Sequence, residues 1–172
     1  AGLEDAFVLD SMRPVFVGVD VGLVRDSTAI VTCQERPDGR LHAVSKVWMP
    51  AMGQTVDIAA VTQYLRDLAK RYQVNAISYD KRLFELPAIM LTEDRLPMVE
   101  VPQSVEQMTP IVGALFERIQ RGGLTHDADE QFGAQVVNAV PRLNERGFTL
   151  SKSKSAPRGH IDAAIALALA VD

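Results

Sequence analysis

The stretch "VFVGVD" (residues 15–20) is a short apolar run that ends in an aspartate. Its β-branched residues are typical of a buried strand. Two further runs, "STAIVTCQER" (27–36) and "RLHAVSKVWMP" (40–50), have the same character, and the turn signal "PDG" (37–39) separates them. Because tight turns join antiparallel neighbours, the start of the chain is predicted to form a three-stranded antiparallel meander.

From residue 51 onward the pattern changes to strands that alternate with helices. In residues 56–72, for example, apolar side chains recur at helical spacing. The order predicts an α/β domain over residues 15–172, with one mixed sheet flanked by helices, after a linker or arm over residues 1–14. The predicted helices are 56–72, 84–94, 104–123, 129–140 and one from about Ile161, and the predicted strands are 74–80, 97–103 and a strand or hairpin arm within 146–159.

The composition narrows the class of protein. The chain has 172 residues, of which 47% are hydrophobic and 23% charged, as in an ordinary domain with one core. A net charge of −4 excludes a globally basic nucleic-acid binder, so affinity for phosphate must come from local basic clusters or bound cations. Cys33 is the only cysteine, which excludes an internal disulfide and fits a reducing compartment. The longest apolar run, 161–171, is shorter than the ~20 residues of a membrane span, so no membrane partner is expected.

Acidic residues follow two of the predicted strands. Asp20 ends strand 15–20 and Asp80 ends strand 74–80, and the carboxyl ends of neighbouring strands meet at the edge where α/β sites gather. Asp162 opens the last helix and joins them if that helix packs across the same edge. Taken singly, an aspartate after a strand is more often a turn residue, and one at a helix start is more often an N-cap. Together, three carboxylates repel one another unless cations neutralise them, and carboxylates suit Mg²⁺ or Mn²⁺.

Such a site suggests phosphodiester hydrolysis, because two ions about 3.5–4 Å apart can hold a phosphodiester between them. Further residues near the acids have a functional and a structural interpretation. Asp26 is either an additional ligand or contact of the acids, or a cap of the loop before strand 27–36. Two groups of basic residues are either contacts for the DNA backbone or solvated side chains. One group stands beside Asp80 and consists of Lys81 and Arg82; the other lies in "SKSKSAPR" and consists of Lys152, Lys154 and Arg158.

Five segments, in this order along the chain, resemble the motifs of one protein family: "VFVGVDVGLVRDSTAIV", "AISYDKRLFE", "GGLTHDADEQFGAQVVNAV", "FTLSKSKS" and "HIDAAIALALA". Over residues 14–171 the chain resembles the nuclease domain of the large terminase subunit of tailed bacteriophages. The resemblance implies an RNase H-like fold and a metal-dependent endonuclease that cuts double-stranded viral DNA during genome packaging.

The resemblance also implies roles for individual residues. Asp20 would bridge two Mg²⁺ or Mn²⁺ ions, with Asp80 and Asp162 each holding one of them. The family pattern adds a histidine, an asparagine and a lysine, which match His126, Asn138 and Lys152 or Lys154. His126 equally fits a surface-loop histidine without a functional role. Asn138 equally fits a side chain that hydrogen-bonds buried backbone groups.

The implied setting is a larger packaging machine in the host cytoplasm, absent from the mature virion. Its other components would be an ATPase motor domain, a small terminase subunit and the portal. The phosphate-loop pattern G-x-x-x-x-G-K-[ST] does not occur in the sequence. The chain is therefore expected to be the nuclease domain of a longer protein.

Three alternatives remain open at this stage. A junction resolvase would share the fold and the metal chemistry. A nucleotide-binding module of the actin or sugar-kinase type is suggested by "GVDVGLVRDSTAIV", which resembles its first phosphate loop, although no second Gly-rich loop is visible. A non-catalytic docking domain would use the same acids only to stabilise its structure, and a lack of divalent-metal binding would favour this alternative.

Overall fold

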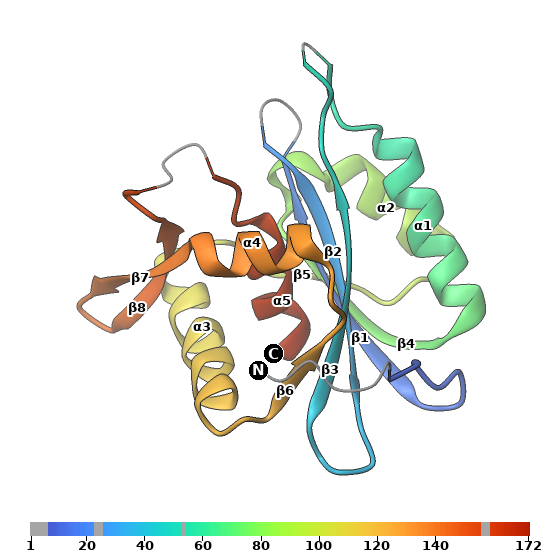
Figure 1. Cartoon of the computed structure of the whole chain (residues 1–172). Helices are drawn as coiled ribbons and strands as arrows, with labels where there is room; N and C mark the ends of the chain where they lie inside the picture. The colour runs from blue at the N-terminus through green and yellow to red at the C-terminus, as the bar shows by residue number, and fades with distance from the viewer. Residues whose placement is uncertain (1–6, 23–25, 53, 156–158) are drawn as a thin grey trace.

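The computed structural model describes residues 7–22, 26–52, 54–155 and 159–172. A six-stranded mixed sheet in the order β5-β4-β1-β2-β3-β6 forms its centre (Figure 1). The strands are β1 (Pro14–Val21), β2 (Thr28–Glu35), β3 (Leu41–Trp48), β4 (Gln73–Tyr79), β5 (Met98–Glu100), β6 (Leu124–His126), β7 (Ala139–Asn144) and β8 (Gly147–Lys152). The helices are α1 (Ile58–Arg71), the 3-10 turn η1 (Lys81–Leu83), α2 (Glu85–Glu93), α3 (Val105–Gln120), α4 (Glu130–Asn138) and α5 (Asp162–Val171).

The predicted meander is confirmed, because β2 pairs antiparallel with both β1 and β3. The first and fourth strands are also neighbours, which is the condition for Asp20 and Asp80 to lie side by side. β4 runs parallel to β1, and their register sets Val19 opposite Tyr79. Asp20 and Asp80 are the next residues along the two strands, so both carboxylates stand at the same edge of the sheet.

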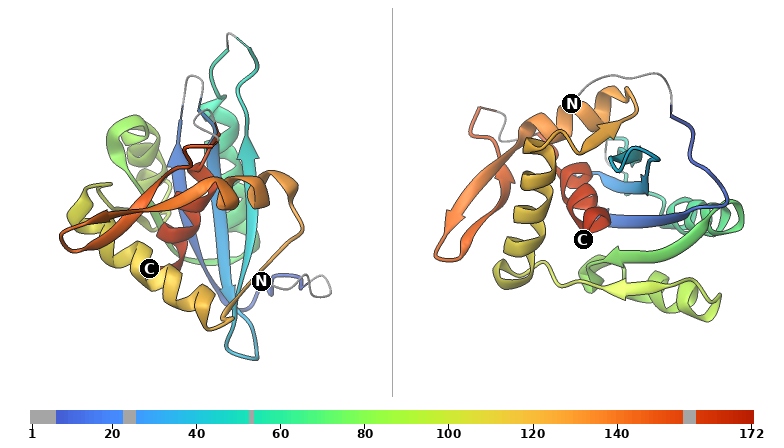
Figure 2. Two further views of the ribbon diagram at one scale, coloured as in Figure 1. Left: turned by 60° about the vertical axis from the view of Figure 1, so that its left-hand side comes forward. Right: turned by 90° about the horizontal axis from the view of Figure 1, so that it is seen from below.

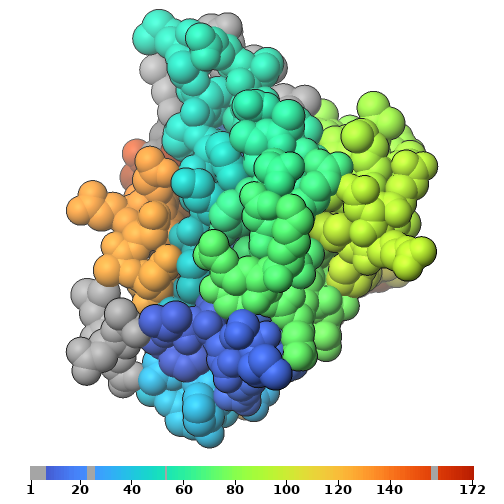
Figure 3. Space-filling view, turned by 90° about the vertical axis from the view of Figure 1, so that its right-hand side faces the viewer, coloured from blue at the N-terminus to red at the C-terminus, as the bar shows by residue number. Residues whose placement is uncertain are grey.

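Two apolar layers cover the two faces of the sheet (Figure 2). The period of two along β2 divides its side chains between them: Ile30 packs toward α1 and α2, whereas Val31 packs toward α3 and α5. The space-filling view in Figure 3 looks onto the side that α1 and α2 cover. The sheet therefore has a helical layer on each face, as the predicted mixed α/β architecture requires, and α5 is buried on nearly all sides.

Helix α5 lies against β1 at unusually short range. A Cβ atom at Gly18 of β1 would stand 1.9 Å from the carbonyl oxygen of Ala166 in α5, so only glycine fits there. On the helix side the contact is made by small residues, since Ala163, Ala166 and Ala170 are all buried. This close packing carries Asp162, the first residue of α5, to the strand edge that holds Asp20.

The hairpin of β7 and β8 differs from the prediction. The expected helix 129–140 ends at Asn138, and residues 139–144 form a strand that pairs antiparallel with β8. The hairpin stands outside the main sheet and packs on α3, where the rings of Phe116 and Phe148 lie 5.3 Å apart. None of the residues of β7 is fully buried, so "AVPRLN" lacks the alternation that would mark it as a strand.

The chain before β1 lies along the sheet without regular structure. Asp10 exchanges two backbone hydrogen bonds with the buried side chain of Gln34 in β2, at 2.7 and 2.8 Å. The division into an arm over 1–14 and one domain over 15–172 stays a prediction. Among the described helices, none combines the length and the apolar character needed to span a bilayer.

Candidate metal centre

Two carboxylates meet where β1 and β4 end. Asp20 and Asp80 line a surface cavity of about 380 Å³ together with Val21, Arg82, Leu83 and Gln103. The cavity opens at the carboxyl ends of parallel strands, which is the usual place for a site in an α/β sheet. The acids predicted from the strand ends therefore share one accessible hollow.

Asp80 is held from two sides. Its Oδ1 accepts a hydrogen bond from the backbone N–H of Arg82 at 2.8 Å, and its Oδ2 accepts one from the backbone N–H of Gln103 at 2.8 Å. The guanidinium Nε of Arg82 lies 3.3 Å from Oδ2. The side-chain amide of Gln103 also donates to Oδ1 of Asp20 at 2.6 Å, which ties the two acids together.

Asp162 enters the same region from α5 and is held by a buried polar network. Its Oδ2 accepts the hydroxyl proton of Ser27, and the hydroxyl oxygen of Ser27 accepts a hydrogen bond from Nε2 of Gln135 at 3.1 Å. Oε1 of Gln135 accepts the backbone N–H of Ala163 at 2.7 Å. The network joins the residue before β2 to α4 and α5, so three distant segments fix the orientation of one carboxylate.

Asp26, His160 and Asp162 form a second group of possible ligands. One ligand atom of each lies within 4.8 Å of the others. His160 Nδ1 lies 3.1 Å from Oδ1 of Asp26 and 3.7 Å from Oδ2 of Asp162. The ammonium group of Lys152 also binds Oδ1 of Asp26, at 2.8 Å. Carboxylate and imidazole groups are donors that divalent cations accept, so this group fits a metal ion.

The electrostatics point to a shortage of positive charge around the acids. Loss of solvent on burial, followed by the charges of Asp162, Asp80 and Asp26, raises the pKa of Asp20 to about 7, against an opposing hydrogen bond from Gln103. Burial, followed by the charge of Asp26, raises the pKa of Asp162, although the Ser27 hydroxyl opposes the shift. A divalent cation would relieve this repulsion. Asp20 feels the charges of all the other acids, so it is the central carboxylate of the group.

Asp80 behaves in the opposite way. Burial alone would raise its pKa, but the backbone N–H groups of Arg82 and Gln103 and the Arg82 guanidinium outweigh that effect and lower it. Asp80 therefore stays ionised well into the acidic range, where Asp20 is already protonated. The site thus holds one carboxylate that is charged at neutral pH beside one whose charge depends on its surroundings.

The other predicted residues are spread over the surroundings. Arg82 contacts Asp80, Lys152 contacts Asp26, and Lys81 pairs with Glu100 at 3.2 Å. Lys154 is exposed on the polar segment after β8. Arg158 lies outside the described residues.

His126 and Asn138 are not brought to the carboxylates. His126 of β6 pairs with Ala43 of β3, Ala43 pairs with Cys33 of β2, and Cys33 pairs with Phe16 of β1. His126 is therefore three strands away from β1, in register with Phe16, which stands four residues before Asp20. Its Nδ1 contacts the backbone carbonyl of the next residue. Asn138 ends α4, and in the described part of the chain its side chain has no hydrogen bond to an acid. The polar residue of α4 that reaches the site network is Gln135, one turn earlier.

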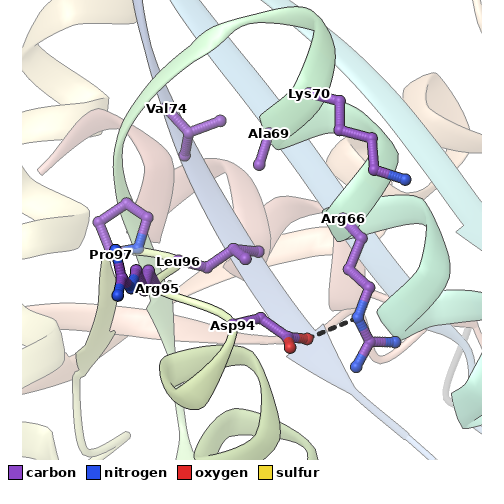
Figure 4. A pocket seen from close by; sticks show the side chains of 8 residues that line it. All are labelled: Arg66, Ala69, Lys70, Val74, Asp94, Arg95, Leu96 and Pro97. Atoms are coloured by element: carbon purple, nitrogen blue, oxygen red, sulfur yellow. Dashed lines mark hydrogen bonds and ion pairs between the residues drawn. The ribbon is translucent and has the colours of Figure 1, made fainter.

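A second, larger cavity of about 500 Å³ lies at the opposite end of β4 (Figure 4). Lys70 lies in the last turn of α1 and Arg95 just after α2, where cations offset the helix dipole. Arg66, in the interior of α1, is paired with Asp94 at 2.7 Å. Asp94 is the one carboxylate among its lining residues, so the acidic chemistry belongs to the smaller cavity. The lining residues are Arg66, Ala69, Lys70, Val74, Asp94, Arg95, Leu96 and Pro97.

Sequence reasoning missed four residues of the centre: Ser27, Gln103, Gln135 and His160. Gln103 lies just beyond strand β5 as Asp80 lies just beyond β4, so the rule that selected the acids could have selected it. His160 stands two residues before Asp162, a spacing that brings both side chains to the start of one helix. Ser27 and Gln135 carry no such signal, because their roles depend on contacts between segments far apart in the sequence.

The sequence model of the family described as "Terminase large subunit, endonuclease domain" matches residues 42–172, a range that includes Asp80 and Asp162 but not Asp20. A comparison with curated protein sequences gives no match.

Solved structures extend the likeness to nearly the whole chain. The large terminase of bacteriophage HK97 matches with a TM-score of 0.81 and 21% identity over 95% of this chain and 40% of that one. The large terminase nuclease of thermophilic phage G20c with bound magnesium matches with a TM-score of 0.71 and 16% identity, over 92% and 80% of the two chains. The g2p (large terminase) nuclease domain of bacteriophage SPP1 with bound Mn matches with a TM-score of 0.61 and 14% identity, over 97% of this chain and 92% of that one. These likenesses confirm the predicted RNase H-like fold, and the chain spans about two fifths of the length of the HK97 protein.

Proposed function

The chain belongs to the endonuclease-domain family of large terminase subunits, and we propose that it is a metal-dependent endonuclease that cuts double-stranded viral DNA during genome packaging. One observation carries the proposal: Asp20, Asp80 and Asp162 converge on one sheet edge, and the pKa of the central carboxylate is raised to about 7. Perturbed carboxylates around an accessible hollow are typical of a catalytic centre.

We propose that Mg²⁺ or Mn²⁺ binds in this hollow, with two ions in the active state. Asp20 and Asp80 would hold one ion, and Asp162 with Asp26 and His160 would hold the other, with Asp20 shared between them. When bound, the ions would supply an activated water and stabilise the leaving oxygen of a phosphodiester. Magnesium and manganese are bound to the related nuclease domains of phages G20c and SPP1, which supports this choice of ions.

The protein side chains would orient these ligands and bind the DNA backbone. Gln103 and the Ser27–Gln135 network hold the carboxylates in place, so little rearrangement would be needed when the ions bind. Arg82 and Lys152 each pair with an acid of the centre and would exchange that partner for a DNA phosphate when an ion takes the acid over. Lys81, Lys154 and Arg158 would add backbone contacts without sequence preference.

We further propose that the domain works inside a longer large terminase in the host cytoplasm. An ATPase motor domain, a small terminase subunit and the portal would be its partners there. The match to 40% of the length of the HK97 large terminase supports a division of labour between this domain and others.

Plasmid cleavage tests the proposal directly. The purified chain is expected to convert supercoiled plasmid to nicked and linear forms in Mn²⁺ or Mg²⁺ and to leave it intact in EDTA. Asp20→Ala is expected to abolish cleavage while the circular dichroism spectrum stays that of a folded protein. Asp67→Asn is the matched control, because Asp67 is an exposed acid of α1 that pairs with Lys70 away from the cavity. Cleavage by the Asp20→Ala variant, or by the wild type in EDTA, would contradict the proposal.

A further inference from the structure

The loop between β5 and α3 sends one residue into the metal centre. Gln103 donates from its backbone N–H to Oδ2 of Asp80 at 2.8 Å and from its side-chain Nε2 to Oδ1 of Asp20 at 2.6 Å. Within the described ranges it is the residue that hydrogen-bonds both of these carboxylates. It therefore links the ends of β1 and β4 through a segment that belongs to neither strand.

The backbone of Gln103 is fixed on both sides. Two residues before it, the N–H of Val101 donates to the carbonyl of Tyr79 at 2.8 Å, which anchors the loop to the end of β4. Directly after it, Ser104 caps α3 by accepting the N–H of Gln107 at 3.2 Å. Pro102 restricts the remaining link. The amide group thus projects from a rigid support, as a group that orients a ligand must.

The hydrogen bonds leave the carboxylates available to a cation. Gln103 occupies Oδ1 of Asp20, and no described residue donates a hydrogen bond to the other oxygen, Oδ2. At Asp80 each oxygen accepts one backbone N–H, and the Nε of the exposed Arg82 side chain lies 3.4 Å from Oδ1 and 3.3 Å from Oδ2. The two backbone bonds orient the carboxylate, and the longer Arg82 contacts are the ones that an incoming cation would replace. The arrangement orients both acids without consuming their capacity to bind a metal ion.

We propose that Gln103 is a positioning residue of the metal centre: it holds Asp20 and Asp80 at the separation and orientation that a divalent cation requires. The inference rests on the proposed function for the identity of the ion. Outer partners that orient metal ligands typically contribute about 10–100-fold in metal affinity or activity. The amide would act on ion binding and leave the DNA contacts on Arg82 and Lys152 unchanged.

Gln103→Met isolates the side-chain contribution. Methionine matches glutamine in length and retains the backbone N–H that holds Asp80, and it removes only the amide that holds Asp20. Gln107→Met is the matched control, because Gln107 is an exposed glutamine one turn away whose side chain has no contact with the centre. If Gln103→Met does not fold, Gln103→Asn serves instead, since its amide is one methylene too short to reach Asp20.

Two readouts separate positioning from general structure. Mn²⁺ binding to the DNA-free protein is titrated by electron paramagnetic resonance, and plasmid cleavage is measured against Mn²⁺ and against DNA concentration. Gln103→Met is expected to raise the half-saturating Mn²⁺ concentration at least about 10-fold in both readouts. The KM for DNA and the Gln107→Met variant are expected to match the wild type.

The outcomes are distinguishable. Wild-type Mn²⁺ affinity in Gln103→Met overturns the positioning role, whether or not the protein cleaves DNA. A raised KM for DNA at unchanged Mn²⁺ affinity overturns it as well, because the amide would then act on the substrate. If the wild type binds Mn²⁺ but leaves DNA intact, the resonance titration still decides the role of Gln103, and only the proposed function fails.

Discussion

Replacing Asp20 by asparagine is expected to stabilise the metal-free protein at alkaline pH. Burial and the neighbouring carboxylates raise the pKa of Asp20 to about 7 in the folded state, from an ordinary value of 3.8. The folded state therefore binds this proton more tightly than the unfolded state does. The contribution of Asp20 to stability is fully present below pH 3.8 and is lost as the pH rises through about 7.

The size of the effect follows from the shift. Each pKa unit is worth about 1.4 kcal/mol, so ionised Asp20 lowers the free energy of unfolding by up to about 4 kcal/mol at pH 8. Asparagine stays neutral and can still accept the hydrogen bond from Gln103, so it avoids this loss. In a domain of this size about 1 kcal/mol moves Tm by roughly 2–4 °C. The stabilisation is therefore expected to reach several degrees at pH 8 and to be small at pH 4.

Thermal unfolding in EDTA, followed by circular dichroism between pH 4 and pH 8, measures this difference. Asp38→Asn is the control of opposite sign, because hydrogen bonds from Arg40 lower the pKa of Asp38 to about 2. Asp38→Asn is expected to lower the Tm at neutral pH, because the ionised carboxylate that Arg40 stabilises is then missing. Saturating Mg²⁺ is expected to stabilise the wild type and to have little effect on Asp20→Asn. An Asp20→Asn variant that is no more stable than the wild type at pH 8, or whose advantage does not grow with pH, would refute the electrostatic reasoning.

Three further expectations concern packing, ligand orientation and DNA binding. Gly18→Ala places a Cβ atom 1.9 Å from the carbonyl oxygen of Ala166, so urea unfolding should show a loss of at least about 3 kcal/mol, and a near-native midpoint would argue against close contact of β1 and α5. Gln135→Leu removes the donor to the Ser27 hydroxyl oxygen and the acceptor of the Ala163 N–H. It should lower stability by about 1–3 kcal/mol and slow cleavage, and wild-type values for both would show that the network does not support the site. Lys154→Ala should weaken DNA binding and reduce the salt slope by about 1 without changing Tm, and an unchanged slope would exclude a phosphate contact there.

The fold was predictable where a local pattern has a single spatial meaning. The apolar run that ends in Asp20 and the one that ends in Asp80 each specify a strand, and the parallel pairing of the two strands brings their ends together. The three-residue strand β6 is too short to show a period, and β7 has no buried face to impose one. Hydrophobic periodicity reports burial, so elements with little burial escape it.

The candidate site was predictable only in its acids. Asp20, Asp80 and Asp162 stand out because a charge at the end of an apolar segment is unusual and has a direct chemical meaning. His126 lies on β6 at the far side of the sheet, a position that depends on a strand the sequence does not signal. Gln135 replaces Asn138 as the site contact because helix α4 turns that position inward. Such facts follow from the packing of helices on the sheet, which local pattern does not determine.

Diffraction from crystals soaked in Mn²⁺, recorded at a wavelength where manganese scatters anomalously, tests the central claim most directly. The account predicts anomalous peaks within coordination distance of the carboxylates of Asp20 and Asp80 and of Asp162. Peaks confined to other surfaces, or an empty cavity at saturating Mn²⁺, would contradict the existence of a shared metal centre.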